Sequence, residues 1–259
     1  YISGCIDQSA CNYDSTATCS DGSCILPDGC TDTTACNYDA TAICNDHSCT
    51  YPISAPYFEN FDAGIGTFTN AGWVLDANGT SSVNTGPSDD MTGGGNYMYY
   101  ETSSGYAPTI TLTSVCLDIS GLLDPCLVFN YHMYGATMGT LDVLVNGTNV
   151  FTMSGNKGNQ WNDAQISLSA YIGSSVTIQF VGTYGTSYTG DMALDNIMVN
   201  ECPYYGCTDT IATNYDFLAN VDDASCYYCA AFTASTTVVD ESAAGNDGSI
   251  DLSLSGGTP

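Results

Sequence analysis

Apolar side chains recur at every second residue in several short runs between residues 97 and 200. Leu141, Val143 and Val145 alternate with Thr140, Asp142 and Leu144, and Val176, Ile178 and Phe180 alternate with Thr177 and Gln179. This period is typical of antiparallel strands with one buried face. The predicted strand regions are YMYYETS (97–103), CLVFNYHMYG (126–135), GTLDVLVNG (139–147), VTIQFVGTYG (176–185) and MALDNIMVN (192–200).

Glycine, asparagine and aspartate separate these runs, as they do at turns between strands. No window of this region shows a helical period that competes with the period of two. Many short strands within about 150 residues predict a β-sandwich. We therefore expect an all-β fold for residues 53–203.

A short cysteine-rich repeat occurs three times outside this region. The copies begin at Cys5, Cys30 and Cys207 and read CIDQSACNYDSTATCSDGSC, CTDTTACNYDATAICNDHSC and CTDTIATNYDFLANVDDASC. The first two carry cysteine at offsets 0, +6, +14 and +19, whereas the third has Thr213 at +6 and Val221 at +14. Because two cysteines that disappear together leave no unpaired thiol, we predict that they bond to each other.

Four cysteines allow three connectivities, and this pattern favours the nested one. The predicted bridges are Cys5–Cys24 around Cys11–Cys19, Cys30–Cys49 around Cys36–Cys44, and a single Cys207–Cys226. Four cysteines remain. Cys116 and Cys126 flank a turn that contains Gly121 and Asp124-Pro125, so we expect them to pair. Cys202 and Cys229 bracket the third repeat, and we expect them to pair around it.

The predicted organisation has five parts. They are repeat modules at 1–26 and 27–52, a β-sandwich at 53–203, a third repeat module at 204–229, and an incomplete last unit at 230–259.

Cysteine content indicates the compartment. Fourteen cysteines in 259 residues are typical of places where disulfides persist. The sequence has no apolar run of about 18 residues that would cross a membrane, and no signal peptide is visible. We expect a fragment of a longer secreted protein that acts outside the cell or on its surface, without direct membrane insertion.

Charge restricts the partners. The chain has 28 acidic residues and a single basic one, Lys157, for a net charge of −27. Nucleic acids and anionic membrane surfaces would be repelled, so neither is expected as a partner. Three explanations for this charge stay open. Divalent cations neutralise clustered carboxylates, a saline environment screens them, or the lack of Lys and Arg removes cleavage sites for trypsin-like proteases.

Aspartate occupies fixed offsets in all three repeats. Offset +2 holds Asp7, Asp32 and Asp209, offset +9 holds Asp14, Asp39 and Asp216, and offset +16 holds Asp21, Asp46 and Asp223. Three carboxylates in a small stapled unit are a candidate Ca²⁺ site, since this ion prefers about six to eight oxygen ligands. The alternative is that these side chains cap turns through hydrogen bonds to nearby backbone amides. The sequence leaves both readings open.

The sandwich region resembles the MAM domain, an extracellular adhesion module with a jelly-roll fold. The resemblance covers nearly all of 57–202. It rests on FENFDAGIGTF (58–68), GW (72–73), GPSDDMTGGGNYMYY (86–100), CLVFNYHMYG (126–135), GTLDVLV (139–145), GNKGNQW (155–161) and GDMALDNI (190–197), in the family's order. Met91 stands where the family usually has His, and Asp195-Asn196 stands where it often has two acidic residues.

This resemblance implies a structural cation, Ca²⁺ or Na⁺. Glu59, Asp62, Asp90 and Asp195 match the family's acidic motifs and are the candidate ligands. The first and last strands of a jelly roll can lie side by side, which would bring Glu59 and Asp195 together. Buried carboxylates need a partner, and no basic residue lies near them in the sequence. We expect a cation to supply that partner.

The three repeats resemble the GCTDxxAxNYDxxAxxDDGSC-type repeats of exported surface proteins of Bacteroidota. The tail AAGNDGSIDLSLSGGTP (243–259) is similar to the opening of Ig-like repeats in the gliding adhesins of those bacteria. Both resemblances imply a multi-modular protein exported to the cell surface.

Candidate catalytic residues are few. The two histidines are His47, in a loop of the second repeat, and His132, in the predicted strand region 126–135. The sequence contains neither a G-x-S-x-G nor an H-E-x-x-H motif. Acidic residues are too abundant for paired carboxylates to indicate a glycosidase. We expect a protein that is not an enzyme.

The sequence favours a fragment of a secreted bacterial adhesin. In this interpretation the MAM-like domain binds a neutral glycan, a protein, or further copies of the same chain, and the repeats are rigid spacers. Two alternatives stay open. The modules are ancillary parts of an exported hydrolase, or the chain is a structural subunit of an extracellular filament.

Overall fold

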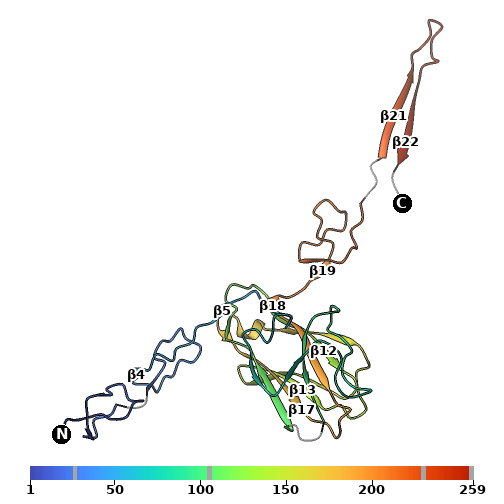
Figure 1. Cartoon of the computed structure of the whole chain (residues 1–259). Helices are drawn as coiled ribbons and strands as arrows, with labels where there is room; N and C mark the ends of the chain where they lie inside the picture. The colour runs from blue at the N-terminus through green and yellow to red at the C-terminus, as the bar shows by residue number, and fades with distance from the viewer. Residues whose placement is uncertain (26–27, 104–106, 229–231, 257–259) are drawn as a thin grey trace. The chain divides into compact units, whose positions relative to one another are not determined.

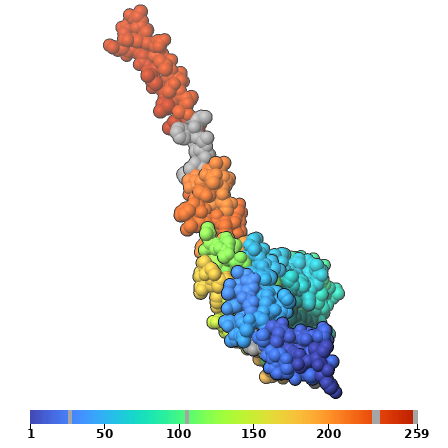
Figure 2. Space-filling model, turned by 90° about the vertical axis from the view of Figure 1, so that its left-hand side faces the viewer, coloured from blue at the N-terminus to red at the C-terminus, as the bar shows by residue number. Residues whose placement is uncertain are grey.

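A computed structural model describes residues 1–25, 28–103, 107–228 and 232–256, and the remaining residues are grey in Figure 1 and Figure 2. The chain divides into two compact units, Tyr1–Cys202 and Pro203–Pro259. The first unit contains two repeats and the sandwich. The second contains the third repeat and a hairpin. This division falls one residue before the predicted boundary after residue 203.

Two antiparallel sheets form the sandwich (Figure 1). The five-stranded sheet has the order β14 (Thr148–Ser154), β13 (Thr140–Val145), β17 (Ile178–Thr183), β10 (Thr109–Thr113) and β7 (Thr69–Ala71). The six-stranded sheet has the order β15 (Trp161–Ser167), β12 (Pro125–Met133), β18 (Met192–Glu201), β9 (Tyr97–Tyr100) and β8 (Val74–Asp76), and β6 (Tyr57–Glu59) also pairs with β18. A small sheet joins β16 (Ser175–Val176), β11 (Leu117–Asp118) and β5 (Ile53–Ser54), and η1 (Ser169–Tyr171) is a single 3₁₀ turn.

The period of two in the sequence becomes the inner face of these strands. The segment 140–145 forms β13, in which Leu141, Val143 and Val145 are fully buried. Phe129 of β12 and Phe180 of β17 meet edge to face with ring centroids 5.0 Å apart, so the two sheets share one core. The fold is an all-β sandwich of the jelly-roll type, as predicted.

The three repeats share one local structure. In each, a two-residue parallel ladder joins the residues before the first cysteine to those at offset +14. The ladders pair β1 (Ser3–Gly4) with β2 (Cys19–Ser20), β3 (Asp28–Gly29) with β4 (Cys44–Asn45), and β19 (Tyr205–Gly206) with β20 (Val221–Asp222). The bridges Cys5–Cys24, Cys30–Cys49 and Cys207–Cys226 close each repeat, with the pairing that the spacing predicts.

The two inner cysteines of a repeat lie at its opposite ends. Cys11 donates its amide to the carbonyl of Ile25, where the chain leaves the first repeat (3.3 Å). Cys19 pairs with Ser3, where the chain enters it. We therefore call the residue at offset +6 the outgoing cysteine and the residue at +14 the incoming cysteine.

The predicted Cys11–Cys19 and Cys36–Cys44 bridges are wrong. Cys11 is bonded to Cys44, the incoming cysteine of the second repeat. Cys36 is bonded to Cys116 of the sandwich. Inner cysteines thus join a repeat to the next unit, because each lies at the end of the repeat that faces a neighbour in the chain. Cys19 forms no disulfide within the described residues.

The predicted Cys116–Cys126 and Cys202–Cys229 bridges are also wrong. Cys126 lies at the start of β12 and Cys202 directly follows β18. Because these strands are antiparallel neighbours, with Cys126 opposite Asn200, the two cysteines meet and bond to each other. Cys229 lies outside the described residues.

Cys116 is within reach of Cys36 because the chain that leaves the second repeat runs beside it. Ile53 of β5 donates its amide to the Cys116 carbonyl (2.9 Å). Strand β5 also pairs with β11, which begins at the residue after Cys116.

The last unit is a hairpin of β21 (Phe232–Val239) and β22 (Ser249–Gly256). Val238, Val239, Ile250, Leu252 and Leu254 are all more than half exposed. The described residues therefore give this hairpin no core of its own.

The described part of the chain has no helix that is long and apolar enough to span a membrane.

The opposite positions of the inner cysteines are testable in the third repeat, which lacks both. In the double variant Thr213→Cys, Val221→Cys we expect two more free thiols than in the wild type, in which Cys19 already has no bridge within the described residues, and an intact Cys207–Cys226 bridge, because the new residues lie at opposite ends of the repeat. Maleimide labelling under denaturing, non-reducing conditions counts the thiols, with each single variant as the control. A bond between positions 213 and 221 would restore the nested scheme.

Candidate functional site

Three of the four predicted cation ligands lie close together, and we call Asp62, Asp90 and Asp195 the acidic cluster. Asp62 follows β6, Asp90 lies between β8 and β9, and Asp195 lies within β18. A Cβ atom on Gly95 would lie 2.0 Å from Oδ1 of Asp62 and 2.7 Å from Oδ2 of Asp90. Only glycine therefore fits between these two carboxylates.

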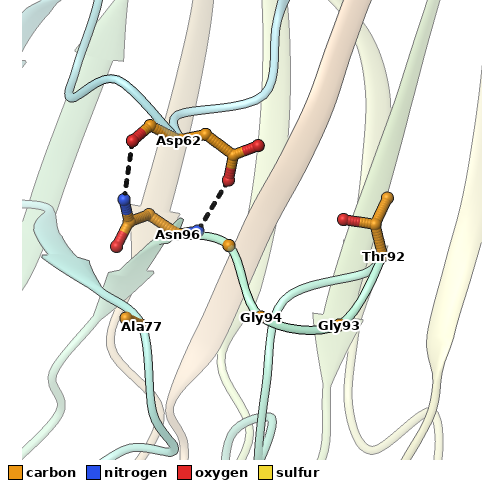
Figure 3. A pocket seen from close by; sticks show the side chains of 7 residues that line it. Asp62, Ala77, Thr92, Gly93, Gly94 and Asn96 are labelled. Carbon is orange, nitrogen blue, oxygen red and sulfur yellow. Dashed lines mark hydrogen bonds between the residues drawn. The ribbon is translucent and has the colours of Figure 1, made fainter.

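Asp62 is fixed by the segment that contains Gly95 (Figure 3). The Asn96 amide donates to Oδ1 of Asp62 (2.9 Å), and Nδ2 of Asn96 donates to the Asp62 carbonyl (3.0 Å). Asp62 and Asn96 line a pocket of about 290 Å³ together with Ala77, Thr92 and Gly93–Gly95. The lining side chains are small and Asp62 is exposed, so water and small ions reach this carboxylate.

Asp195 is the most deeply buried member of the acidic cluster, with 1% of its surface exposed. Its Oδ2 accepts the Met91 amide (3.0 Å) and its Oδ1 accepts the Asn196 amide (2.7 Å). Burial raises the pKa of Asp195 to about 6, and the charges of Asp90 and Asp62 add to this effect against the two hydrogen bonds. The carboxylate is thus held in a place that penalises its charge.

Asp90 is also buried, at 5% exposure. Burial acts to raise its pKa, but hydrogen bonds from Thr92 and from the Gly95 and Gly93 amides outweigh it, so the pKa of Asp90 is lowered. Its Oδ1 is buried and has no hydrogen-bond partner among the described residues. An ionised carboxylate with an unsatisfied buried oxygen is a feature that fits a bound cation.

The carboxylate of Glu59 lies beside Gly66, whereas those of Asp62 and Asp90 lie beside Gly95. Glu59 lies on β6 opposite Ile197 of β18, so the first and last long strands do pair. Its Oε1 accepts the Phe61 amide (2.9 Å), and its carboxylate fills the space beside Gly66. Within the described residues no group of three His, Cys, Asp or Glu side chains has the spacing of a formed metal site. The acidic cluster is therefore a close pair, Asp62 and Asp90, with Asp195 beside it.

The fixed aspartates of the repeats cap turns. Each accepts the backbone amide two residues further on, at 2.8–3.0 Å. They are Asp7, Asp14, Asp21, Asp32, Asp39, Asp46, Asp209, Asp216 and Asp223. Hydrogen bonds from the Ser9 hydroxyl and amide lower the pKa of Asp7, and Thr16 does the same for Asp14. These are Asx turns, the turn-capping role that the sequence left open as the alternative to Ca²⁺ binding.

A buried acidic residue that sequence reasoning missed is Asp191. It is fully buried, and its Oδ1 accepts both the amide and the hydroxyl of Thr102 (2.9 Å each). Burial raises the pKa of Asp191 against the hydrogen bonds from Thr102 and Thr80. Asp191 falls in the GDMALDNI motif, but nothing in the sequence distinguishes it from the exposed aspartates.

A second pocket of about 290 Å³ lies elsewhere on the sandwich, and we call it the polar pocket. Its lining side chains carry hydroxyl and amide groups, one proline and one aromatic ring. The residues are Gly79, Thr80, Ser82, Asn84, Thr85, Gly86, Pro87, Ser88, Tyr134 and Asn159. None of them is charged. Gly86–Ser88, Tyr134 and Asn159 fall in three of the motifs that carry the resemblance, but no single motif marked the pocket, because its residues come from three separate segments.

His132 connects the polar pocket to the core. It is 2% exposed, its Nε2 lies 3.2 Å from Oδ1 of Asn159, and its ring meets Trp161 edge to face at 5.5 Å. Burial lowers the pKa of His132 to about 4, against the raising effect of the bond to Asn159. The ring is therefore neutral near pH 7 and holds the Asn159 side chain at the pocket.

Known proteins resemble the sandwich region. A family model described as the MAM domain (meprin/A5/mu) matches residues 59–203. MAM domain-containing glycosylphosphatidylinositol anchor protein 1 of Gallus gallus is 36% identical over 146 residues, which are 50% of this chain and 15% of that protein. Neuropilin-1a of Danio rerio is 29% identical over 136 residues, which are 49% of this chain and 15% of that protein. The chain thus spans about a seventh of the length of these relatives.

Two solved structures align with part of this chain. The K1 cleaved adhesin domain of Lys-gingipain from Porphyromonas gingivalis W83 aligns with a TM-score of 0.43 and 14% identity, over 57% of this chain and 99% of that one. A family 35 carbohydrate binding module from Clostridium thermocellum aligns with a TM-score of 0.37 and 18% identity, over 57% of this chain and 99% of that one.

Burial of neutral His132 predicts a loss of stability in mild acid. The unfolded chain binds a proton at a pKa of about 6.5, whereas the folded chain does so at about 4. The stability is present above pH 6.5 and is lost as the pH falls through 4, by up to about 3 kcal/mol. Denaturant unfolding of the wild type and of His132→Gln between pH 7.5 and 4 measures the effect.

The difference between the two proteins is the informative quantity. The raised pKa of Asp195 acts in the opposite direction, since its contribution is lost as the pH rises through about 6, but it is common to both. His47→Gln, at an exposed position in the second repeat, is the control and should leave the profile unchanged. Parallel profiles for wild type and His132→Gln would contradict the prediction.

Proposed function

The chain belongs to the MAM domain family, and we propose from this premise that its sandwich is an extracellular adhesion module that binds a neutral glycan in the polar pocket. The matched domain is a binding module. The class of ligand follows from the chemistry of the pocket.

The absence of charge in the polar pocket carries this proposal. The chain has a net charge of −27, yet the pocket lining contains no carboxylate and no basic group. An acidic surface repels anionic ligands over the distance of a Debye length. A ligand that is polar but uncharged meets no such penalty.

A sugar unit matches the groups that line the pocket. Ser82, Asn84, Ser88 and Asn159 offer donors and acceptors for sugar hydroxyls, and Tyr134 offers an aromatic ring for the apolar C–H face of a sugar. A volume of about 290 Å³ is at the lower limit for ligand sites, which span roughly 300–1,000 Å³. It suits a single terminal unit of a glycan, free or carried on a partner protein.

We also propose that Ca²⁺ neutralises the acidic cluster. Asp62, Asp90 and Asp195 would hold the ion, and the unsatisfied Oδ1 of Asp90 and the glycine at position 95 support this assignment. The ion would supply positive charge where the protein has none, because the only basic residue is Lys157. It would thereby tie the segments around Asp62 and Asp90 to β18.

The repeats act as stapled spacers in this proposal. Each one is closed by its own outer disulfide, and the first two are bonded onward through Cys11 and Cys36. Such bonds restrict the orientation of one unit relative to the next. In a secreted or surface-attached protein, these spacers would hold the binding domain at a defined distance from the neighbouring units.

Removal of the ring in the polar pocket tests the glycan proposal. We expect Tyr134→Ala to lower affinity for a glycan identified on an array at least tenfold, and Tyr134→Phe to retain most of it, because the ring supplies the stacking surface. Tyr188→Ala is the matched control, since this tyrosine is half exposed and outside the pocket. Titration calorimetry gives the affinities, and melting curves verify that each variant is folded.

Two results would count against the glycan proposal. One is the absence of any glycan signal for the folded wild type with Ca²⁺ present. The other is an equal loss of affinity in Tyr134→Ala and Tyr188→Ala. Sedimentation of the same samples reports whether another copy of the chain is the ligand instead.

Asp195→Asn tests the cation proposal because its effect reverses with Ca²⁺. In chelator we expect this variant to be about 1–3 kcal/mol more stable than the wild type, since it removes a buried charge. In excess Ca²⁺ the wild type gains about 2.7 kcal/mol at a hundredfold excess over the dissociation constant, and the variant gains less. Melting curves at constant ionic strength measure both.

Asp118→Asn provides the matched control for the cation. Its carboxylate lies on β11 and accepts the Ser120 amide (2.8 Å), away from the acidic cluster. It should respond to Ca²⁺ as the wild type does. Identical wild-type curves in chelator and in Ca²⁺ would exclude the ion while leaving the glycan proposal intact.

A further inference from the structure

We propose that Cys19 is the attachment point for the outgoing cysteine of a further repeat of the same type. Repeats would then join head to tail through one disulfide at each junction. The partner is defined by its chemistry: a repeat of this sequence pattern with an unpaired cysteine at offset +6.

Cys19 occupies the entering end of the first repeat. Its amide donates to the Ile2 carbonyl (3.3 Å), and its sulfur lies 3.6 Å from the same oxygen. Cys44 takes the same place in the second repeat, in the ladder with Asp28–Gly29, and it is bonded to Cys11. The position of Cys19 is therefore one that accepts the outgoing cysteine of a neighbour.

Both outgoing cysteines are already bonded in the forward direction. Cys11 and Cys36 donate their amides to the carbonyls of Ile25 and Thr50, where the chain leaves each repeat (3.3 and 2.8 Å). Cys11 bonds to the second repeat and Cys36 to the sandwich. Neither is available to Cys19, which is half-buried and has no bridge within the described residues.

The third repeat shows that the fold itself does not need these cysteines. Val221 at the entering end donates to the Tyr204 carbonyl (3.1 Å), and Thr213 at the leaving end donates to the Tyr227 carbonyl (2.9 Å). The bond at the leaving end is that of both other repeats, and the bond at the entering end is that of the first repeat. This repeat stands between units of other kinds in the sequence and lacks both inner cysteines. A cysteine at position 19 therefore indicates a junction, not a staple.

The reaction is an ordinary thiol oxidation. The sulfurs of Cys19 and of the partner lose one proton and one electron each and form a bond. A disulfide oxidant such as oxidised glutathione takes up the two electrons and two protons and is reduced to two thiols.

An extended chain tests the proposal. A copy of residues 5–24 is placed before Tyr1 with one linking residue, so that five residues separate its last cysteine from Cys5, as five separate Cys24 from Cys30. The copy carries cysteine at +6 and, like Val221, valine at +14. After refolding in a glutathione buffer we expect a bond from its +6 cysteine to Cys19. Maleimide labelling of Cys19 should fall at least tenfold relative to the original chain.

The matched control carries threonine at +6 of the added repeat, as at Thr213. Cys19 should stay fully reactive in it, because its partner is missing. Peptide maps from a protease that cuts after aromatic residues locate the bonds, and the Cys5–Cys24 bond reports that the first repeat is folded. Equal labelling of Cys19 in both extended chains, with Cys5–Cys24 formed, would overturn the proposal.

The variant Cys44→Val of the original chain frees Cys11. It tests whether the partner repeat can belong to a separate copy of the chain or must belong to the same polypeptide. Disulfide-linked oligomers joined from Cys11 of one chain to Cys19 of the next would show that a separate copy can serve. Monomers with both thiols free, alongside a bonded extended chain, would restrict the partner to the same polypeptide. A Cys11–Cys19 bond within one repeat would overturn the proposal, since the two cysteines would not lie at opposite ends.

Discussion

Every carboxylate of this protein has to be satisfied almost without basic side chains, and much of the structure follows from that constraint. The chain has 28 acidic residues and one basic residue. Exposed carboxylates solve the problem locally, because nine aspartates of the repeats each accept a backbone amide two residues further on. In this way the acidic side chains stabilise the turns of the repeats. Buried carboxylates also accept backbone amides, but within the described residues Oδ1 of Asp90 is buried without a hydrogen-bond partner.

The repeats show how such units are stable without a core. Each one buries only its first cysteine and the alanine five residues later among its apolar side chains, at 1–8% exposure. This is far too little apolar surface to offset the entropy of ordering about twenty residues. The outer disulfide and the Asx turns take the place of a core. The inner cysteines are then free to link neighbouring units. Noncovalent packing of so small a surface would not hold these units together.

Each of the two candidate sites of the sandwich contains a glycine at a position where a side chain would clash with its neighbours. Gly95 leaves room for the carboxylates of Asp62 and Asp90, and Gly86 approaches the side chain of Thr80 beside the polar pocket. Both glycines lie in segments between strands, whose ends are fixed by the sheets. The core supplies rigidity, and the loops supply ligands. A neutral, buried His132 connects the core to a loop by holding the Asn159 side chain at the polar pocket.

The sequence by itself determined what depends on neighbours in the chain. Alternation at 140–145 predicted β13 because side chains of a strand alternate between faces, and fixed spacing predicted the outer bridges. Tertiary structure decided which distant groups meet. The inner cysteines Cys11 and Cys36 bond to other units of the chain, an outcome that spacing within one repeat does not reveal. Asp62, Asp90 and Asp195 come together while the Glu59 carboxylate lies beside Gly66, because strand pairing and local hydrogen bonds, not sequence motifs, set the positions of these side chains.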